Sequence, residues 1–261
     1  MKIATWNING IKARHDVLLR WLDEASPDVA CLQEIKSVDE GFPTDVFEGM
    51  GYNVVVHGQK SFNGVAVLSK APIEDVRKGL PGDEDDLQAR YLEVVVSAAT
   101  NQVARVACIY LPNGNPIATE KFPYKLAWME RLQAHAQELL DLEEPLLLTG
   151  DYNVIPEDED CVSPAGWGDD ALFQPESRDA FKRLKNLGFV DAVRACDAAE
   201  KTYTFWDYQA GAWQKNNGIR IDHLLLSCQA ADKLSGAGID KHTRSWERPS
   251  DHVPVWVELE L

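Results

Sequence analysis

The chain has 261 residues, of which 45% are hydrophobic, and this is enough apolar material for one sizeable core in a single domain spanning residues 1–261. Its longest apolar runs have the length of β-strands, far below the roughly 20 residues of a membrane-spanning helix, so no membrane span is expected. The 42 acidic and 26 basic residues give a formal net charge of −16, which argues against nonspecific binding to nucleic acid but leaves room for a local basic site.

Short segments rich in Val, Ile and Leu recur along the chain and predict buried β-strands. In chain order they are 3–8, 28–33, 52–56, 65–69, 91–97, 103–111, 146–149, 220–227 and 253–259. Between them, three stretches carry apolar residues at helical spacing, around Trp21, around Leu132 and around Phe181. Many strands with a few helices predict packed sheets covered by helices, a domain of the α+β type.

The cysteines predict a protein of a reducing compartment. They are five in number and show no C-x-x-C spacing, and Cys31 and Cys108 lie inside strand-like apolar runs, where a buried thiol is expected. The N-terminal residues have neither a long apolar stretch nor a small-residue cleavage site. We therefore expect a soluble, cytoplasmic protein.

Polar residues gather where the predicted strands begin or end. They are Asn7 and Asn9, Glu34, Asp151 and Asn153, Asp222, and Asp251 with His252. Each group alone is typical of a turn or a solvated strand end, because Gly, Asp and Asn supply unusual backbone angles. Together they provide carboxylates, amides and one histidine, without thiolates. Oxygen ligands of this kind are those that a hard cation such as Mg²⁺ prefers.

Seven motifs spread over nearly the whole chain resemble those of one enzyme family. They are TWNING (5–10), LQE (32–34), NGVA (63–66), YLPNG (110–114), GDYNV (150–154), RID (220–222) and PSDHVPV (249–255). In this order they resemble the exonuclease III family of abasic-site endonucleases, within the endonuclease/exonuclease/phosphatase superfamily. The resemblance implies a four-layer α/β sandwich, in which two mixed β-sheets pack face to face between helices.

The resemblance implies a metal site and a set of catalytic residues. Glu34 would be the main Mg²⁺ ligand, with Asn7 and Asp251 close to the ion, and Mn²⁺ is expected to substitute. The residues expected to act on the phosphate are Asp151, Asn153, Tyr110, Asp222 and His252.

Each of these residues has an expected role. Asp151, held by Asn153, would deprotonate the attacking water. Asp222 would fix the ring of His252 through one nitrogen, so that the other faces the phosphate. His252 and Tyr110 would stabilise the charge that grows on the phosphate oxygens.

Substrate contacts are expected from Asn9, Arg90 and Asn113, and from an apolar pocket wall formed by Phe205 and Trp206. Core packing is the alternative for the two aromatic residues, because the chain is rich in Trp. Eukaryotic members of the family carry a Trp at the position of Ile219, so the pocket of this chain is expected to differ in shape from theirs. Basic residues next to the motifs predict a local track for the DNA backbone: Lys12, Arg14, Lys36, Lys60, Lys121, Lys125 and Lys215.

The sequence thus predicts a monomeric Mg²⁺-dependent hydrolase that acts on duplex DNA at abasic sites and at 3′ ends. Two alternatives remain open. One is a small-molecule or phosphoinositide phosphatase of the same superfamily, which would use the same metal and water. The other is a noncatalytic interaction module that kept the fold, although none of the expected chemical residues is missing.

Overall fold

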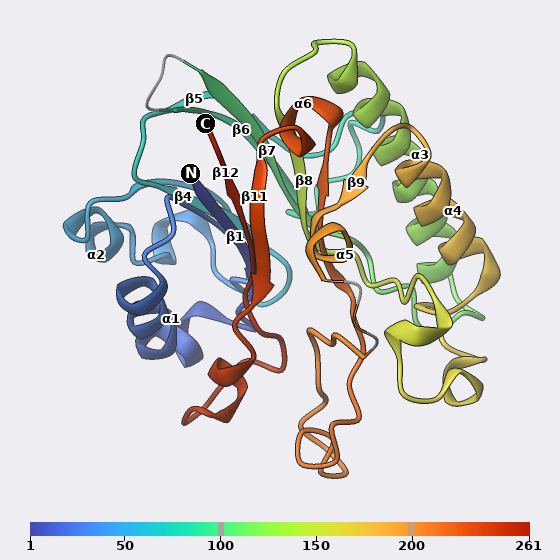
Figure 1. The fold of residues 1–261 in the computed structure, drawn as a ribbon. Helices are drawn as coiled ribbons and strands as arrows, with labels where there is room; N and C mark the ends of the chain where they lie inside the picture. Colours follow the sequence, from blue (N-terminus) through green and yellow to red (C-terminus); the bar gives the residue numbers. More distant parts are fainter. Residues whose placement is uncertain (99–101, 198, 200) are drawn as a thin grey trace.

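The computed structural model describes residues 1–98, 102–197, 199 and 201–261. Two six-stranded mixed sheets pack face to face, and helices cover the outer face of each (Figure 1). The four-layer α/β sandwich expected from the sequence is confirmed.

The first sheet contains both the first and the last strand of the chain, in the order β11-β12-β1-β2-β4-β3. Its strands are β1 (Lys2–Asn7), β2 (Val29–Gln33), β3 (Asn53–His57), β4 (Val65–Ser69), β11 (Leu234–Ile239) and β12 (Val255–Leu259). Only β1 and β2 are parallel neighbours. The five residues of β2 are all buried, as expected for a strand covered on both faces.

The second sheet has the order β5-β6-β7-β8-β10-β9. Its strands are β5 (Ile73–Lys78), β6 (Tyr91–Ser97), β7 (Val103–Tyr110), β8 (Leu146–Asp151), β9 (Val190–Asp191) and β10 (Asp222–Leu226). Here β7 and β8 are the parallel pair. Each sheet therefore has one parallel pair near its centre, and the carboxyl ends of both pairs carry polar motifs.

Helices α1 and α2 cover the first sheet, and α3 and α4 cover the second (Figure 1). The helices are α1 (Ile11–Ala25), α2 (Thr44–Gly49), α3 (Lys121–Leu140), α4 (Pro175–Lys185), α5 (Ala192–Cys196) and α6 (Cys228–Ala231). Short 3₁₀ turns lie at Asp39–Gly41, Asp158–Asp160, Pro164–Trp167 and Lys241–Ser245. Helix α1 is capped by Ser26, which adopts left-handed backbone angles and donates its N–H to the carbonyl of Leu22. No helix within the described ranges is long and apolar enough to cross a bilayer.

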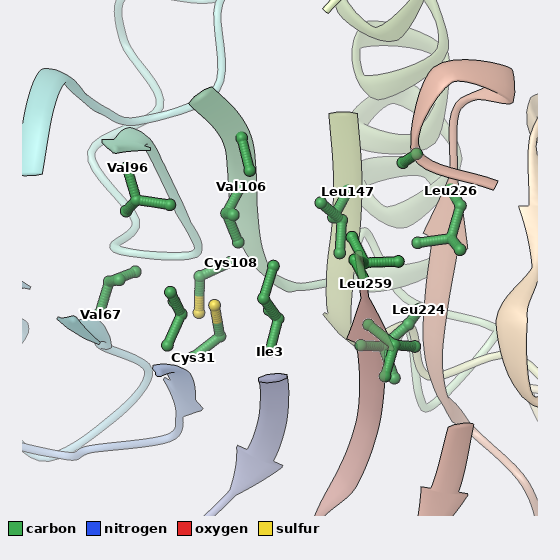
Figure 2. Packing of buried hydrophobic residues seen from close by; sticks show 14 of the residues in the cluster. Ile3, Cys31, Val67, Val96, Val106, Cys108, Leu147, Leu224, Leu226 and Leu259 are labelled. Carbon is green, nitrogen blue, oxygen red and sulfur yellow. The ribbon is translucent and has the colours of Figure 1, made fainter. Parts of the chain in front are cut away.

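The central core lies between the two sheets (Figure 2). Side chains from β1, β2 and β4 meet those from β6, β7, β8 and β10, and all are removed from solvent. Cys31 and Cys108 face each other in this layer, so the expectation that they are buried is confirmed. Because the strands are held on both faces, the side chains at their ends have little freedom to move.

Candidate active site

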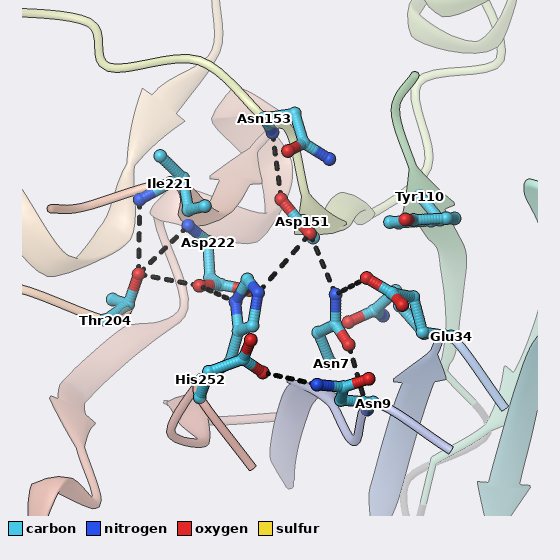
Figure 3. A network of polar contacts seen from close by, with 12 residues as sticks. Asn7, Asn9, Glu34, Tyr110, Asp151, Asn153, Thr204, Ile221, Asp222 and His252 are labelled. Carbon is cyan, nitrogen blue, oxygen red and sulfur yellow. Dashed lines mark hydrogen bonds and ion pairs between the residues drawn. The ribbon is translucent and has the colours of Figure 1, made fainter. Parts of the chain in front are cut away.

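The strand ends that carry the polar motifs meet at one edge of the sandwich (Figure 3). The parallel pairing of β1 with β2 brings Asn7, at the end of β1, beside Glu34, which follows β2. The parallel pairing of β7 with β8 sets Tyr110 opposite Asp151. Strand β10 runs antiparallel to β8 and begins with Asp222, also opposite Asp151. Residues far apart in the sequence are therefore neighbours because of sheet topology.

His252 joins this group from the segment before β12. Its Nδ1 lies 2.8 Å from Oδ2 of Asp222, and its Nε2 lies 3.7 Å from Oδ2 of Asp151. The Thr204 hydroxyl donates a hydrogen bond to Oδ2 of Asp222 at 2.6 Å and accepts the backbone N–H groups of Ile221 and Asp222. Asp222 is thus fixed from two sides, and the ring of His252 is oriented by it.

Burial and neighbouring charges together raise the pKa values of both His252 and Asp151. Burial alone would lower the pKa of His252, but the negative charges of Asp222 and Asp151 outweigh it and raise that pKa to about 10. Burial raises the pKa of Asp151 to about 7, while the charge of His252 opposes the rise and that of Asp222 adds to it. The site thus contains a cationic imidazole and a carboxylate able to accept a proton near neutral pH.

Asn7 links Asp151 to Glu34. Its Nδ2 donates hydrogen bonds of 2.9 Å to Oε1 of Glu34 and to Oδ2 of Asp151. Lys36 forms an ion pair with the other oxygen of Glu34 at 2.8 Å. Burial would raise the pKa of Glu34, but the charge of Lys36 and the hydrogen bonds from Asn7 and Lys36 outweigh it and lower that pKa. Glu34 is therefore ionised, as a ligand for a divalent cation must be.

The oxygen atoms around Glu34 fit a hard divalent cation. The Lys36 ammonium group lies between Oε2 of Glu34 and Oδ1 of Asn9, so oxygen atoms of this site already hold a positive charge. Asn9 in turn donates to Oδ1 of Asp251 at 3.0 Å. Lys36 thus connects Glu34 to Asn9, and Asn9 connects to Asp251. None of these side chains contains sulfur. Carboxylate and amide oxygens are what Mg²⁺ selects.

A second group, Asp151, Asp222 and His252, has its candidate ligand atoms within 4.8 Å of one another. Within this group both ring nitrogens of His252 are engaged by carboxylates, Nδ1 by Asp222 at 2.8 Å and Nε2 by Asp151 at 3.7 Å. The group is better suited to hold and move protons.

Asn153 holds the opposite side of Asp151. Its backbone N–H donates to Oδ1 of Asp151 at 2.9 Å, and its side-chain amide donates to the carbonyl of Leu111. Asn113 donates to Oδ1 of Asn153 at 3.1 Å. Asn153 has left-handed backbone angles, with φ of 47°. The asparagines therefore fix the loops after β7 and β8 against each other.

Tyr110 and Arg90 lie together beside Glu34 and Asp151. The guanidinium group of Arg90 lies 4.8 Å from the ring centroid of Tyr110 and donates to its backbone carbonyl at 3.4 Å. Burial, together with the charges of Glu34 and Asp151, raises the pKa of Tyr110 well above its usual value. The phenol thus keeps its proton and can donate it in a hydrogen bond to an oxyanion.

Comparison with known proteins agrees with this geometry. The model of the Endonuclease/Exonuclease/phosphatase family matches residues 4–252. The chain belongs to this family. The resemblance expected from the sequence motifs is therefore confirmed.

Several relatives in this family are similar over their whole length. Exodeoxyribonuclease III of Haemophilus influenzae is 36% identical, and the match covers 99% of this chain and 100% of that protein. The structure of a 3′ phosphatase from Neisseria bound to a product DNA hairpin is 34% identical, with a TM-score of 0.94 and full coverage of both chains. An AP endonuclease from Archaeoglobus fulgidus is 35% identical, with a TM-score of 0.93 and full coverage of both chains.

The two aromatic residues expected to form a pocket wall lie in different surroundings. Phe205 is half-buried, and its ring packs 4.9 Å from the imidazole of His252, centroid to centroid. Trp206 is fully buried, packs against Trp213 and donates to Asn216. Phe205 thus lies at the candidate active site, beside His252. Trp206 packs inside the loop and has no exposed surface that a substrate could contact.

Six of the seven basic residues that were expected to contact the DNA backbone are at least partly exposed. Four are exposed and two are half-buried: Lys12, Lys60, Lys121 and Lys215, and Arg14 and Lys36. The prediction for Lys125 was wrong, because its side chain is fully buried. Its ammonium group contacts protein carbonyls and cannot reach a DNA backbone.

Sequence reasoning missed several residues that hold this site. Thr204 fixes Asp222 but lies in the loop between α5 and β10, where its local sequence gives no sign of this role. Ser250 donates to the backbone carbonyl of Asn7 and accepts the N–H of His252, which joins the last motif to the first. Ser250 was part of a recognised motif, so its position could have suggested a role. Thr204 could be found only from the fold.

Proposed function

We propose that the chain is a divalent-metal-dependent DNA repair nuclease, which hydrolyses the phosphodiester backbone at abasic sites and removes nucleotides or blocking groups from 3′ ends. The relatives described as exodeoxyribonuclease III, AP endonuclease and 3′ phosphatase support this substrate class. The observation that carries the proposal is the junction at Asn7, whose amide joins the carboxylate of Glu34 to that of Asp151. A cation site and a proton acceptor are thereby held at a fixed separation.

In the proposed reaction Asp151 takes a proton from a water molecule, whose oxygen forms a bond to phosphorus while the bond to the leaving oxygen breaks. The backbone N–H of Asn153 keeps Asp151 aligned with the water. The imidazolium of His252 and the phenol of Tyr110 donate hydrogen bonds to the phosphate oxygens. A divalent ion held by Glu34, with Asn7 and Asp251 nearby, supplies further stabilisation of negative charge when it is bound. Mg²⁺ is the ion proposed, with Mn²⁺ as a substitute.

Asn9, Arg90, Asn113 and Phe205 are proposed to contact the substrate, and the exposed basic residues are proposed to contact the DNA backbone. Affinity for duplex DNA should then fall steeply between low and moderate salt, although the whole protein is acidic. An affinity independent of salt would contradict the basic track. A monomeric state and a cytoplasmic location remain part of the proposal, the latter resting on the number and spacing of the cysteines.

The test is an assay panel with Mg²⁺ on four substrates: an abasic duplex, an undamaged duplex with a recessed 3′ end, a duplex with a 3′ phosphate, and an inositol phosphate. We expect incision of the abasic duplex and activity on the 3′ ends. Asp151→Asn, purified in parallel, is expected to lose both, which excludes a contaminating nuclease.

The other outcomes decide between the alternatives. Hydrolysis of the inositol phosphate alone would identify a phosphatase and overturn the proposal. Absence of turnover on all four substrates, with a folded protein and both Mg²⁺ and Mn²⁺ tested, would identify a noncatalytic module.

A further inference from the structure

Lys125 lies beneath the candidate active site, on the second turn of α3, and its side chain is fully buried. Its ammonium group donates hydrogen bonds to two backbone carbonyl oxygens, that of Asn113 at 3.1 Å and that of Asn153 at 2.5 Å. These carbonyls belong to the loops after β7 and after β8. One side chain thus connects both loops from the protein interior.

A buried ammonium group is costly, so its position calls for a physical reason. Burial lowers the pKa of Lys125 to about 7, and the charges of Asp151 and Asp170 offset only part of this effect. Within the described residues, the acceptors found for its three N–H groups are the two loop carbonyls. A lysine that merely filled space could be replaced by an apolar residue without that cost. The cost of burying Lys125 must therefore be offset by the positions that its hydrogen bonds give to the two loops.

Asn153 is held at four points around the catalytic carboxylate. Its carbonyl accepts from Lys125, its N–H donates to Asp151, its amide donates to the carbonyl of Leu111, and its Oδ1 accepts from Asn113. Asn113 is held by Lys125 as well. Because Asn153 adopts left-handed backbone angles, it depends on such contacts to keep its conformation.

The loop after β7 is built closely around this lysine. Gly114 has φ of 89°, and a Cβ atom at this position would lie 2.7 Å from Cδ of Lys125 and 3.1 Å from Cβ of Ala171. A side chain at Gly114 would therefore displace the lysine. The absence of a side chain at Gly114 thus allows the loop backbone to pack against the side chain of Lys125.

We propose that Lys125 is a positioning residue of the active site, whose ammonium group fixes the carbonyls of Asn113 and Asn153 and thereby aligns Asp151 with the attacking water. It acts through these residues and does not contact the DNA. The proposal rests on the proposed nuclease function for its kinetic test, but its structural part can be tested without any substrate.

The kinetic test compares Lys125→Met with the wild type on an abasic duplex at saturating Mg²⁺. Methionine has a similar length and cannot donate a hydrogen bond. We expect kcat to fall by about 10- to 100-fold, the order expected for misplacing a catalytic group, while KM changes little. Lys182→Met, at an exposed site on α4, is the matched control and is expected to behave as wild type. A change confined to KM would indicate DNA contact instead and would overturn the proposal.

A second variant and a second measurement keep the result decisive. Lys125→Gln retains two N–H donors on a shorter side chain, so it should recover part of the lost kcat; if Lys125→Met does not fold, Lys125→Gln alone should still lower kcat and leave KM unchanged. A wild-type kcat in Lys125→Gln together with a folded, fully active Lys125→Met would rule the proposal out.

Amide hydrogen exchange tests the same idea without turnover. In either variant, exchange at Asn153 should become faster than in the wild type, while the strand β6 keeps its protection. Unchanged exchange at Asn153 would contradict the positioning role. If the wild-type protein does not cleave DNA, the proposed function fails, and this measurement still decides the role of Lys125.

Discussion

Nδ1 of His252 lies 2.8 Å from Oδ2 of Asp222, although the two residues are 30 positions apart in the chain. Both are buried, and Thr204 holds the same carboxylate oxygen at 2.6 Å. Because the carboxylate engages one nitrogen of the ring, the other nitrogen is directed toward Asp151. The pair therefore sets both the charge and the orientation of the imidazole.

Asp222 and His252 are expected to act as one unit in turnover. His252→Asn removes the imidazolium, and Asp222→Asn frees the ring and removes the charge that raises the pKa of His252. Each single variant should lower kcat by about 100-fold or more, as for loss of a general acid–base group. The double variant should cost little more than the worse single one, because the two groups work through the same proton.

The measurement is a double-mutant cycle on kcat with an abasic duplex at saturating Mg²⁺. Thermal denaturation of each variant checks that the fold is kept. If the two effects multiply independently, the residues do not cooperate and the pairing has no catalytic meaning.

Asp151→Asn is expected to keep the fold and to lose most of the activity. The amide preserves the size of the side chain and can still accept the N–H of Asn153 through its oxygen. It cannot take a proton from water, so kcat should fall by about 10²- to 10⁴-fold. Asp179→Asn, at an exposed position on α4, is the control. A loss below about tenfold would mean that another residue accepts the proton.

Most of the fold could be predicted from apolar runs because its central strands are buried on both faces. The nine predicted strand segments each overlap a strand of the structure. The strands β5, β9 and β11 were not predicted, and the sequences of β5 and β11 give the reason. The residues of β5 are mostly exposed and charged, and β11 contains Gly236 and Gly238, so neither shows an apolar pattern. Their extended form is set by pairing with β6 and β12.

The sequence predicted which polar residues gather at the strand ends, but not the residues that support them. Carboxylates and amides at strand ends are visible in a sequence, and the parallel pairs β1–β2 and β7–β8 bring them together. The supporting contacts of Thr204 and Lys125 depend on neighbours that only the fold supplies. Lys125 is predicted to be a surface residue for DNA because it is charged and close to a motif. Its position four residues before Met129, however, places it on the apolar face of α3, which is turned inward.

Metal removal is expected to abolish activity. Without a divalent ion, the negative charges of Glu34, Asp151 and Asp251 facing a phosphate anion would be offset only in part, by Lys36 and His252. Excess chelator should stop turnover, and added Mg²⁺ or Mn²⁺ should restore it. Glu34→Gln should raise the Mg²⁺ concentration for half-maximal activity by more than tenfold, whereas Glu176→Gln on the outer face of α4 should not. Full activity in excess chelator would remove the basis for a metal site at Glu34.

A buried acidic group away from the site should govern stability in acid. Glu93 on β6 accepts hydrogen bonds from Arg105 at 2.8 Å and from Tyr91 at 2.7 Å, and its Oε2 lies 2.7 Å from Nε2 of His135 on α3. Burial would raise the pKa of Glu93, but the hydrogen bonds from His135 and Tyr91 and the charge of His135 outweigh it and lower the pKa to about 2. The ionised carboxylate thus joins the second sheet to the helix that covers it.

A carboxylate with a lowered pKa in the folded state contributes stability that is present above its unfolded pKa and is lost as the pH falls toward the folded value. For Glu93 this window runs from the ordinary value of 4.5 down to about 2. At pH 7 the contribution to the free energy of unfolding is up to about 3 kcal/mol, from the size of the pKa difference.

Urea denaturation at pH 7, 4 and 3 should therefore show wild-type stability falling as the pH is lowered. Glu93→Gln should be less stable than the wild type at pH 7, and its stability should fall less between pH 7 and pH 3. Glu130→Gln, exposed on α3, should follow the wild type. Parallel pH curves for wild type and Glu93→Gln would show that Glu93 is not the group that titrates.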